Sequence, residues 1–277
     1  MNTAHLGQIT IGDGHSLALI AGPCVLEERD LNMRTAESIR KISDEQNIPF
    51  IFKASYEKDN RGNAESYTGP GLEKGLKQLE EIQKTFSVPV TSDVHRMEDI
   101  PAAAEVLDLI QIPAYLCQQT SLLLAAGCCG KPVNVKKGQF LAPENIASPV
   151  GKLRHAGCKN ILVTERGSCF GYNRLISDIT CIPKIKEHGV PVVYDATHIV
   201  RIYGIPSKDP CGGESRYVPE LLRAGVAAGA DAVFIETHPE PASARCDASS
   251  MLDLARLPDT LKELKQIAEL VRSMGKK

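Results

Sequence analysis

Short apolar runs recur along the chain and alternate with longer segments in which apolar residues return every three or four positions. Each run is bounded by turn residues and is short enough to be a buried strand. The runs cover residues 16–23, 50–56, 88–94, 109–114, 133–138, 160–167, 191–198 and 232–238. The pattern therefore predicts eight buried strands.

The segments between these runs have the spacing of amphipathic helices. It is clearest in residues 31–47, 69–86 and 259–274. In the second of these segments, Leu72 and Leu76 lie four positions apart and so share one helix face. We expect helices between the strands, each with an apolar stripe packed against them.

Eight strands that alternate with eight helices, without a linker-like stretch, predict one α/β domain over residues 1–277. Its barrel, a (β/α)8 TIM barrel, would span residues 16–277. Residues 8–16 suggest a β-hairpin, and an N-terminal extension of residues 1–15 would cap the bottom of the barrel. A doubly wound open sheet is the alternative. The segment AGPCVLEE after the first predicted strand lacks the GxGxxG pattern of the dinucleotide-binding version of that fold.

The composition fits a large core and an ordinary charge balance. A chain of 277 residues, 43% of them hydrophobic, buries on the order of 70–75% of its unfolded surface. Lys and Arg number 32 against 34 Asp and Glu, a net charge of -2, which argues against binding to nucleic acid or to an anionic membrane. No apolar run approaches the roughly 20 residues of a membrane span. No secretory pattern stands at the N-terminus, so we expect a cytoplasmic location.

Nine cysteines are spread along the chain without a recognisable framework. The number is odd and no CxxC pair occurs, so neither a disulfide scaffold nor a zinc finger is indicated. Most of these cysteines are expected to be reduced, buried thiols.

Polar residues gather where the predicted strands end. They are Cys24, Lys53, Ser55, Asp93, His95, Gln111, Lys136, Glu165, Arg166, Asp195, His198, Glu236 and His238. In a TIM barrel the C-terminal strand ends converge on one mouth, where catalysis takes place. An unpaired charge in a dry core costs several kcal/mol, so we interpret most of this set as functional, although some members could form ion pairs that only hold the barrel together.

Two chemical subsets stand out among these residues and those of the following loops. The cations suit an anionic substrate such as a phosphate or carboxylate, because they form charge-assisted hydrogen bonds. They are Lys53, Lys58, Arg61, Lys136 and Arg166. A thiol, an imidazole and two carboxylates suit a divalent transition metal. They belong to Cys24, His198, Glu236 and Asp247. Spacing alone leaves open whether these four residues meet.

The motifs that carry these residues closely resemble the 3-deoxy-D-manno-octulosonate 8-phosphate (KDO8P) synthases over nearly the whole chain. They are IAGPC (20–24), FKASYEKDNR (52–61), TSDVH (91–95), LIQIPAYLC (109–117), VNVKKGQFLAP (133–143), TERGSCFGYN (164–173), YDATH (194–198) and IETHPEP-x5-DASSM (235–251). The sister family of DAHP synthases shares GPC, an FK strand, ERG and an ETHP-like end, but neither VNVKKGQF nor FGYN.

The resemblance implies a (β/α)8 homotetramer that condenses phosphoenolpyruvate with arabinose 5-phosphate and water. The products would be KDO8P and inorganic phosphate, on the route to KDO and lipopolysaccharide. Carbon 3 of the enol must attack the aldehyde while water adds at carbon 2, and the phosphate later leaves by C–O cleavage. The implied partners are therefore two small phosphorylated substrates and further copies of the chain.

The resemblance also assigns roles to individual residues. The phosphoenolpyruvate pocket would comprise Lys53, Ser55, Gln111, Lys136 and Arg166. The aldose phosphate would be held by Asn60 and Arg61, lent across a subunit interface, and by Asp93. The metal ligands would be Cys24, His198, Glu236 and Asp247. Metal-independent members of the family have Asn in place of this cysteine, so Cys24 indicates a divalent ion such as Mn, Fe, Zn or Co.

The reaction gives four residues a place in catalysis. Lys136 would position the donor, Lys58 or His198 would move protons, and Asp247 would act with the metal. The metal could polarise the aldehyde or lower the pKa of water.

The chain departs from the family pattern on the acceptor side. Gln118 stands where the family has Arg, and Gly62 stands where it has Ser. After His198 the family has SVQ, where this chain has Ile199-Val200-Arg201. The donor is therefore expected to be phosphoenolpyruvate, while the acceptor stays open. Another aldehyde acceptor, a DAHP-synthase-like activity and a non-catalytic barrel are the alternatives.

Of three further residues, two have simpler interpretations than a role at the site. His95 is more simply a core histidine, and Tyr172 could pack between helices. His238 could face inward as a further metal ligand, because it lies two positions after Glu236 in the same predicted strand.

Overall fold

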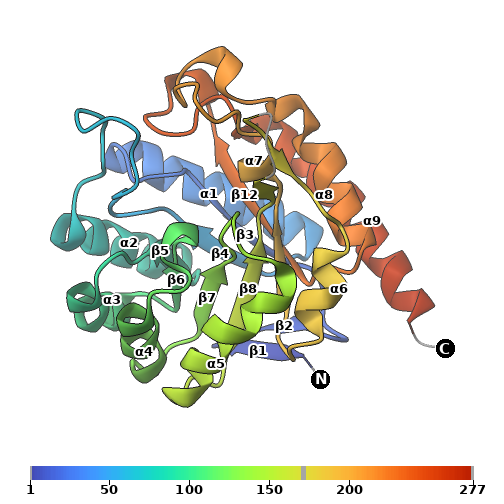
Figure 1. Cartoon of the computed structure of the whole chain (residues 1–277). Helices are drawn as coiled ribbons and strands as arrows, with labels where there is room; N and C mark the ends of the chain where they lie inside the picture. Colours follow the sequence, from blue (N-terminus) through green and yellow to red (C-terminus); the bar gives the residue numbers. More distant parts are fainter. Residues whose placement is uncertain (1, 170–172, 276–277) are drawn as a thin grey trace.

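A closed barrel of parallel strands forms the centre of the protein. The computed structural model describes residues 2–169 and 173–275 (Figure 1). Within these residues the barrel strands are β3 (Ala18–Gly22), β4 (Phe50–Lys53), β5 (Val90–Asp93), β6 (Leu109–Ile112), β7 (Val133–Lys136), β8 (Ile161–Glu165), β11 (Val192–Asp195) and β12 (Ala232–His238). Each strand pairs in parallel with the next, and β12 pairs back with β3. The prediction of a (β/α)8 TIM barrel is confirmed, and the closure excludes an open sheet.

Helices cover the outside of the barrel, between consecutive strands and after the last one. They are α1 (Arg29–Gln46), α2 (Leu72–Phe86), α3 (Ile100–Val106), α4 (Thr120–Cys128), α5 (Ala147–His155), α6 (Cys181–Lys186), α8 (Val218–Ala227) and α9 (Leu257–Met274), with the single turn α7 (Ala196–Ile199) before α8. The clearest predicted helices correspond to α1, α2 and α9, with ends that differ by a few residues. Asn47 and Ser87 adopt the left-handed conformation and end α1 and α2.

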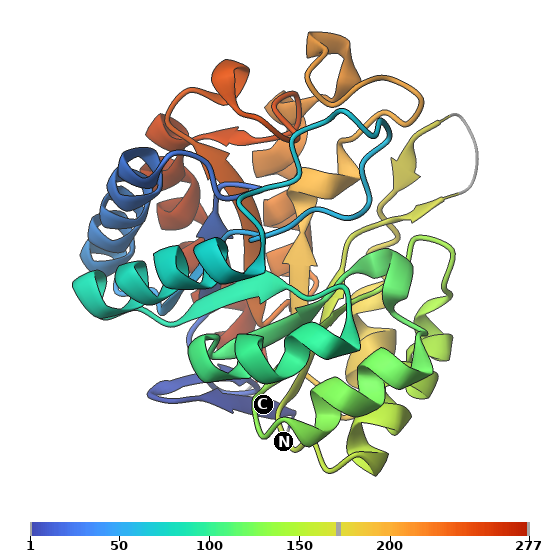
Figure 2. The same ribbon diagram turned by 90° about the vertical axis from the view of Figure 1, so that its left-hand side faces the viewer.

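The N-terminal hairpin closes the bottom of the barrel. Its strands are β1 (Thr3–Leu6) and β2 (Ile9–Gly12), which pair antiparallel. The predicted N-terminal hairpin is confirmed, but its bounds of residues 8–16 are wrong: the strands cover residues 3–12, and the turn lies at Gly7, whose φ of +55° suits glycine. Leu6 and Ile11 are buried and pack against the inner face of the barrel. Both ribbon views show the hairpin beneath the strands (Figures 1 and 2).

Side chains alternate between two cores along each strand. In β3, Ala18 and Ile20 belong to the core inside the barrel, whereas Leu19 and Ala21 belong to the core between strands and helices. The inner core is lined with apolar side chains near the hairpin, for example Leu109 of β6.

That the whole chain forms one domain, with an extension over residues 1–15, stays a prediction.

Two positions further along, the inner side chains become polar. Ile51 of β4 is followed on the same face by Lys53, Leu109 of β6 by Gln111, Val193 of β11 by Asp195 and Phe234 of β12 by Glu236. This change collects charged groups at the C-terminal mouth, beneath the long loops at the top of Figure 2.

Short strands lie in the loops at this mouth. Strands β9 (Ser168–Cys169) and β10 (Leu175–Ile176) form a short hairpin after β8, and β13 (Leu252–Asp253) adds to β12. Tyr172 of the FGYN motif lies outside the described residues. Among the described helices, none combines the length and the apolar composition needed to cross a membrane.

Candidate active site at the barrel mouth

A cavity of about 770 Å³ opens at the C-terminal mouth. Most of the predicted site residues line it: Lys53, Lys58, Asn60, Arg61, Asp93, Gln111, Lys136, Arg166, His198 and Asp247. Cys24, Ser55 and Glu236 are fully or almost fully buried beneath its surface. The fold thus brings the predicted donor, acceptor and metal residues of one chain to one place, and Arg61 lines the cavity of its own chain.

A belt of hydrogen bonds forms part of the floor of the cavity. Thr164 Oγ1 donates to Asn134 Oδ1 at 2.8 Å, and Asn134 Nδ2 donates to Gln111 Oε1 at 2.9 Å. Gln111 Nε2 then donates to Asp93 Oδ1 at 2.7 Å, while Ser55 Oγ donates to Asp93 Oδ2 at 2.6 Å. These hydrogen bonds fix the side-chain orientation of Gln111. The Ser55 hydroxyl is used by its hydrogen bond to the Asp93 carboxylate.

Two lysines surround the Asp93 carboxylate. Lys58 Nζ lies 3.2 Å from Asp93 Oδ2, and Lys53 Nζ lies 3.7 Å from the same oxygen and 3.2 Å from Glu236 Oε1. Burial alone would raise the pKa of Asp93, but the two ammonium groups outweigh it and hold this pKa well below its usual range. Asp93 is therefore an anion that orients both lysines.

Lys136 and Asp195 form a buried ion pair. The Lys136 ammonium contacts Asp195 Oδ2 and also lies 3.6 Å from the ring centre of Phe234, a cation–π geometry. Asp195 also lies 2.7 Å from His198 Nδ1. Burial would raise the pKa of Asp195, but the neighbouring His198 and Lys136 hold it well below its usual range. Asp195 thus positions a donor-side lysine and the predicted metal-ligand histidine together.

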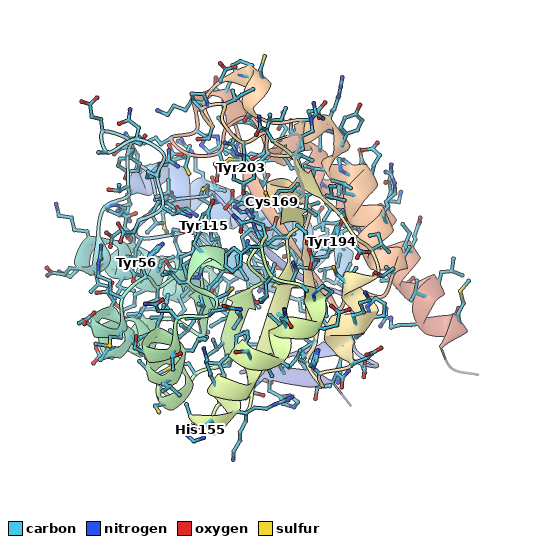
Figure 3. The ribbon with its side chains drawn as sticks, in the orientation of Figure 1. Tyr56, Tyr115, His155, Cys169, Tyr194 and Tyr203 are labelled. Carbon is cyan, nitrogen blue, oxygen red and sulfur yellow. The ribbon has the colours of Figure 1, made fainter. Side chains whose placement is uncertain are left out.

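Arg166 presents a buried guanidinium with unused hydrogen-bonding capacity. Its side chain follows β8, and Nη1 donates to the Tyr203 hydroxyl at 3.3 Å. Its Nε atom has no hydrogen-bond partner among the described residues. Tyr203 and Tyr115 line the same cavity, and Figure 3 shows Tyr203 above Tyr115. Arg166 can therefore offer several donors to an anion in the cavity.

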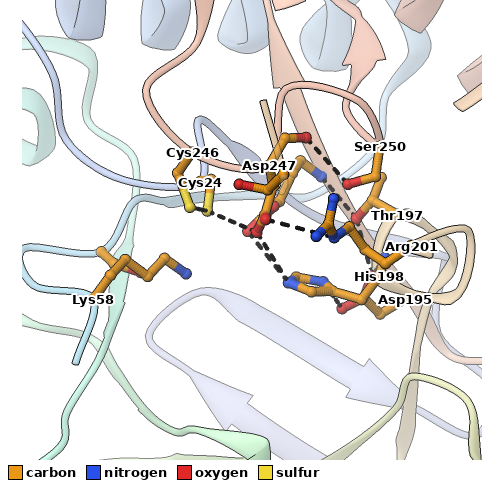
Figure 4. A network of polar contacts seen from close by, with 12 residues as sticks. Cys24, Lys58, Asp195, Thr197, His198, Arg201, Cys246, Asp247 and Ser250 are labelled. Atoms are coloured by element: carbon orange, nitrogen blue, oxygen red, sulfur yellow. Dashed lines mark hydrogen bonds and ion pairs between the residues drawn. The ribbon is translucent and has the colours of Figure 1, made fainter. Parts of the chain in front are cut away.

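The four predicted metal ligands come together at the C-terminal ends of the neighbouring strands β3, β11 and β12. Asp247 Oδ2 lies 3.2 Å from Cys24 Sγ and 3.9 Å from His198 Nε2, and this nitrogen lies 3.8 Å from Glu236 Oε1. Figure 4 shows Asp247 between the sulfur atoms and the imidazole. Gly22 places Cys24 here: a Cβ on Gly22 would come within 2.1 Å of the Lys53 carbonyl oxygen, so only glycine allows this approach.

The donor set fits a divalent transition metal. Glu236 Oε2 is buried and, within the described residues, has no hydrogen-bond partner. An unpartnered carboxylate oxygen inside a protein is costly unless a ligand satisfies it. A thiol, an imidazole and two carboxylates are donors that ions such as zinc or iron accept. Cys24, His198, Glu236 and Asp247 could therefore hold such an ion.

Several residues at the site were missed from the sequence. Cys246 Sγ lies 2.9 Å from Cys24 Sγ, and Arg61 Nη1 lies 2.6 Å from Cys246 Sγ. Arg201 Nε lies 3.8 Å from Asp247 Oδ1. The position of Cys246 next to Asp247 in the chain was the available signal. Nothing in the sequence alone indicated that Cys24 lies beside it.

The two uncertain histidines have different environments. His95, expected to be a core residue, is half-buried and lines the cavity because it follows β5 at the mouth. His238 is buried, and its Nδ1 accepts from the backbone N–H of Glu240 at 2.9 Å. Its other ring nitrogen lies 3.8 Å from Glu27. Among the described residues, His238 is in neither group of donors close enough to share an ion.

The departures from the family pattern fall in two places. Gly62 and Arg201 line the cavity, whereas Gln118 is exposed and is not one of the residues that line it. The altered acceptor-side residues thus include two that line the cavity and one, Gln118, that does not.

Comparison with known proteins agrees with the motifs. The DAHP synthetase I family matches residues 2–273. The 2-dehydro-3-deoxyphosphooctonate aldolase of Azoarcus sp. is 48% identical over 267 residues, 96% of this chain and 95% of that protein. Proteins of the same name from Synechococcus sp. and Trichlorobacter lovleyi are 47% and 45% identical, over 95% and 96% of this chain and 93% and 98% of theirs. This name denotes the KDO8P synthases, so the resemblance is confirmed: the chain is an enzyme that belongs to the DAHP synthetase I family.

Proposed function

We propose that the chain condenses phosphoenolpyruvate with an aldose phosphate and water in a metal-dependent reaction. Arabinose 5-phosphate is the first candidate acceptor, and the products are then KDO8P and inorganic phosphate. One observation carries the proposal: the buried cations Lys53, Lys136 and Arg166 share a cavity with the cluster around Asp247. The name that the relatives share, 2-dehydro-3-deoxyphosphooctonate aldolase, supports the same reaction.

The donor side of the cavity suits a small molecule with a phosphate and a carboxylate. Lys136 and Arg166 would hold these groups, and Lys53 would add a third positive charge. Gln111 would offer its side chain in the orientation that the hydrogen-bond belt fixes. The Ser55 hydroxyl is directed to Asp93, so its contribution to donor binding would be to orient that carboxylate. Fixed positive groups of this kind position the reactants and can contribute several kcal/mol.

The acceptor would enter above the donor. Asn60 and Arg61 lie in the loop between β4 and α2 and would hold the phosphate of the sugar, while Asp93 lies deeper and would accept from a sugar hydroxyl. The aldehyde end would then point toward the cluster of Cys24 and Asp247. In this arrangement the two reacting carbons would lie between the cation group and the metal-ligand group.

The chemistry requires two new bonds and one broken bond. The enol electrons form the bond from carbon 3 of the donor to the aldehyde carbon, and the aldehyde oxygen takes a proton. Water adds at carbon 2 and loses one proton. The bond from carbon 2 to the phosphate oxygen then breaks, the phosphate leaves with the electron pair and takes up a proton, and the hydroxyl on carbon 2 loses its proton and becomes the keto oxygen. Lys58 lines the cavity and is the group that could carry these protons, because His198 would hold the ion through Nε2 while its Nδ1 faces Asp195. Asp195 would hold the His198 ring in place as a ligand.

A divalent ion would be held by Cys24, His198, Glu236 and Asp247. When bound, it would supply a Lewis acid toward an oxygen of the acceptor. We expect excess chelator to abolish turnover and Mn²⁺ or a similar ion to restore it, measured as phosphate release. Elemental analysis of the purified protein should find about one ion per chain, and full turnover in excess chelator would contradict the assignment.

The acceptor is tested by a survey of aldose phosphates. Phosphate release is measured with phosphoenolpyruvate and arabinose 5-phosphate, erythrose 4-phosphate or other aldose phosphates in turn. A clear preference for arabinose 5-phosphate supports the KDO8P reaction, and a preference for erythrose 4-phosphate supports a DAHP-synthase-like activity. Another acceptor is the second candidate because Gly62 and Arg201, which depart from the family, line the cavity. Activity on arabinose 5-phosphate comparable to that on its best rival would remove the case for a divergent substrate.

Assembly and location are also proposals. The chain is expected to form a homotetramer in the cytoplasm, by analogy with the family. Light scattering after size-exclusion chromatography measures the first property, and fractionation of the producing cell measures the second. A monomer with full activity would argue against any role of a second subunit at the site.

A further inference from the structure

Cys246 occupies a position that the four predicted ligands do not explain. It precedes Asp247 in the loop after β12 and is 1% exposed. Its sulfur atom lies 2.9 Å from that of Cys24, which itself lies 3.2 Å from Asp247 Oδ2. The two thiols therefore face each other beside a carboxylate, on the same side of Asp247 in Figure 4.

The donor atoms form two groups that share one residue. Cys24, Cys246 and Asp247 make one group, and His198, Glu236 and Asp247 make the other, each with ligand atoms within 4.8 Å of one another. Glu236 contributes a second, independent observation. Its Oε2 atom is buried and has no hydrogen-bond partner in the part of the chain that the structure describes.

We propose that Cys246 is a second sulfur ligand of the metal centre. The centre then offers two thiolates, one imidazole and the carboxylates, and it favours thiophilic ions such as Zn²⁺ over oxygen-preferring ions such as Mn²⁺. The inference rests on the proposed metal dependence, because it concerns which residues of this chain hold the ion and which ion they select.

The surrounding charges support a pair of sulfur anions. Thiolates bind metals as anions, so two of them add two negative charges to those of Glu236 and Asp247. Arg61 Nη1 lies 2.6 Å from Cys246 Sγ, and Arg201 Nε lies 3.8 Å from Asp247 Oδ1. Lys53 Nζ lies 3.2 Å from Glu236 Oε1. Cys246, Asp247 and Glu236 thus each have a cation beside them, and a bound dication would offset the charge of the Cys24 thiolate as well.

The loop backbone holds Cys246 in place. Asp247 has φ +49°, a left-handed conformation that is rare for a residue with a side chain. The Asp247 carbonyl accepts from the backbone N–H groups of Ser250, at 3.0 Å, and Met251, at 3.2 Å. This turn presents the Cys246 and Asp247 side chains to the same group of atoms. Such a constrained backbone suits residues that act together on one ligand.

The test uses cobalt(II) as the probe, under a strong phosphine reductant that keeps all thiols reduced. The full-length protein is stripped with chelator, titrated with Co²⁺, and followed by the near-ultraviolet absorption of cobalt–thiolate bonds. The variants are Cys246→Ser, Cys24→Ser and the control Cys158→Ser, a buried cysteine whose sulfur contacts the carbonyls of Lys131 and Asn160. Affinity is measured by competition with a chromophoric chelator.

The wild type and Cys158→Ser should show the full absorption. Cys246→Ser and Cys24→Ser should each show about half of it, because each retains one thiolate. Cobalt affinity should fall at least about tenfold in Cys246→Ser, since loss of an outer-shell partner alone typically costs 10–100-fold. The ratio of the Zn²⁺ affinity to the Mn²⁺ affinity should become smaller in the same variant.

Two outcomes would overturn the inference. In one, Cys246→Ser keeps the wild-type spectrum and affinity; in the other, Cys24→Ser loses the whole band, which would make Cys24 the sole sulfur ligand. Because Cys24→Ser tests Cys246 directly, a folding defect in Cys246→Ser does not remove the test. Absence of stoichiometric cobalt binding in the wild type would instead refute the proposed metal centre itself.

Discussion

Replacement of Arg166 by Ala tests the donor side of the site. This guanidinium donates to the Tyr203 hydroxyl through Nη1 over a long distance, 3.3 Å. Its Nε atom has no hydrogen-bond partner among the described residues. The N–H groups that Tyr203 does not use could therefore bind phosphoenolpyruvate. Two charge-assisted hydrogen bonds, each about 1.5–3 kcal/mol, then disappear in the variant. We expect kcat/KM for phosphoenolpyruvate to fall by roughly 10²–10⁴-fold, at about 1.4 kcal/mol per factor of ten.

The loss should be the same with every acceptor, because Arg166 would contact only the donor in the proposed reaction. The assay is phosphate release at varied phosphoenolpyruvate with each active acceptor. Arg166→Lys should recover part of the rate, since lysine keeps the charge but not the planar fork. The control is Arg174→Ala, an exposed arginine paired with Glu214, and it should retain the wild-type rate. A normal kcat/KM for Arg166→Ala, in a protein whose melting temperature is unchanged, would refute the phosphate-binding role.

Three further predictions concern stability. Gln111→Leu should lower the free energy of unfolding by about 2–4 kcal/mol in urea titrations, because Asp93 and Asn134 each lose a buried partner. Ile11→Ala should cost about 2–5 kcal/mol yet leave kcat/KM unchanged, because it lies at the bottom of the barrel. Burial raises the pKa of the Cys158 thiol from 9.0 to about 11, so the unfolded chain loses this proton first. Stability should therefore fall by about 2 kcal/mol between pH 9 and 11, and Cys158→Ser should lack this component.

The barrel and its mouth were predictable because they depend on local patterns. Apolar runs of strand length separated by amphipathic segments are sufficient to indicate alternating strands and helices. The period of two along a strand then explains why Lys53 and Gln111 point into the same space: each follows an inward apolar residue by two positions. A parallel barrel sends all such positions to one end. The site residues on strands could therefore be found without coordinates.

The contacts between loops could not be predicted in this way. Cys24 and Cys246 are separated by more than two hundred positions, and no periodicity relates the loops that carry them. The hairpin was misplaced for a related reason. Its turn depends on one glycine with positive φ, Gly7, which precedes the segment for which the hairpin was predicted. The sequence placed Asp195 among the polar residues at the strand ends. Only the structure shows that its carboxylate contacts both Lys136 and His198.

The division of the site between strands and loops bears on how its specificity can change. Lys53 and Lys136 belong to β4 and β7, where backbone pairing on both sides holds them. Asn60, Arg61 and Arg201 belong to loops, whose sequences can vary without disturbing the barrel. The departures from the family pattern at Gly62 and Arg201 occur in these loops. A change of acceptor therefore requires no change in the donor pocket, which is why the survey of acceptors, and not further work on the donor, decides the reaction.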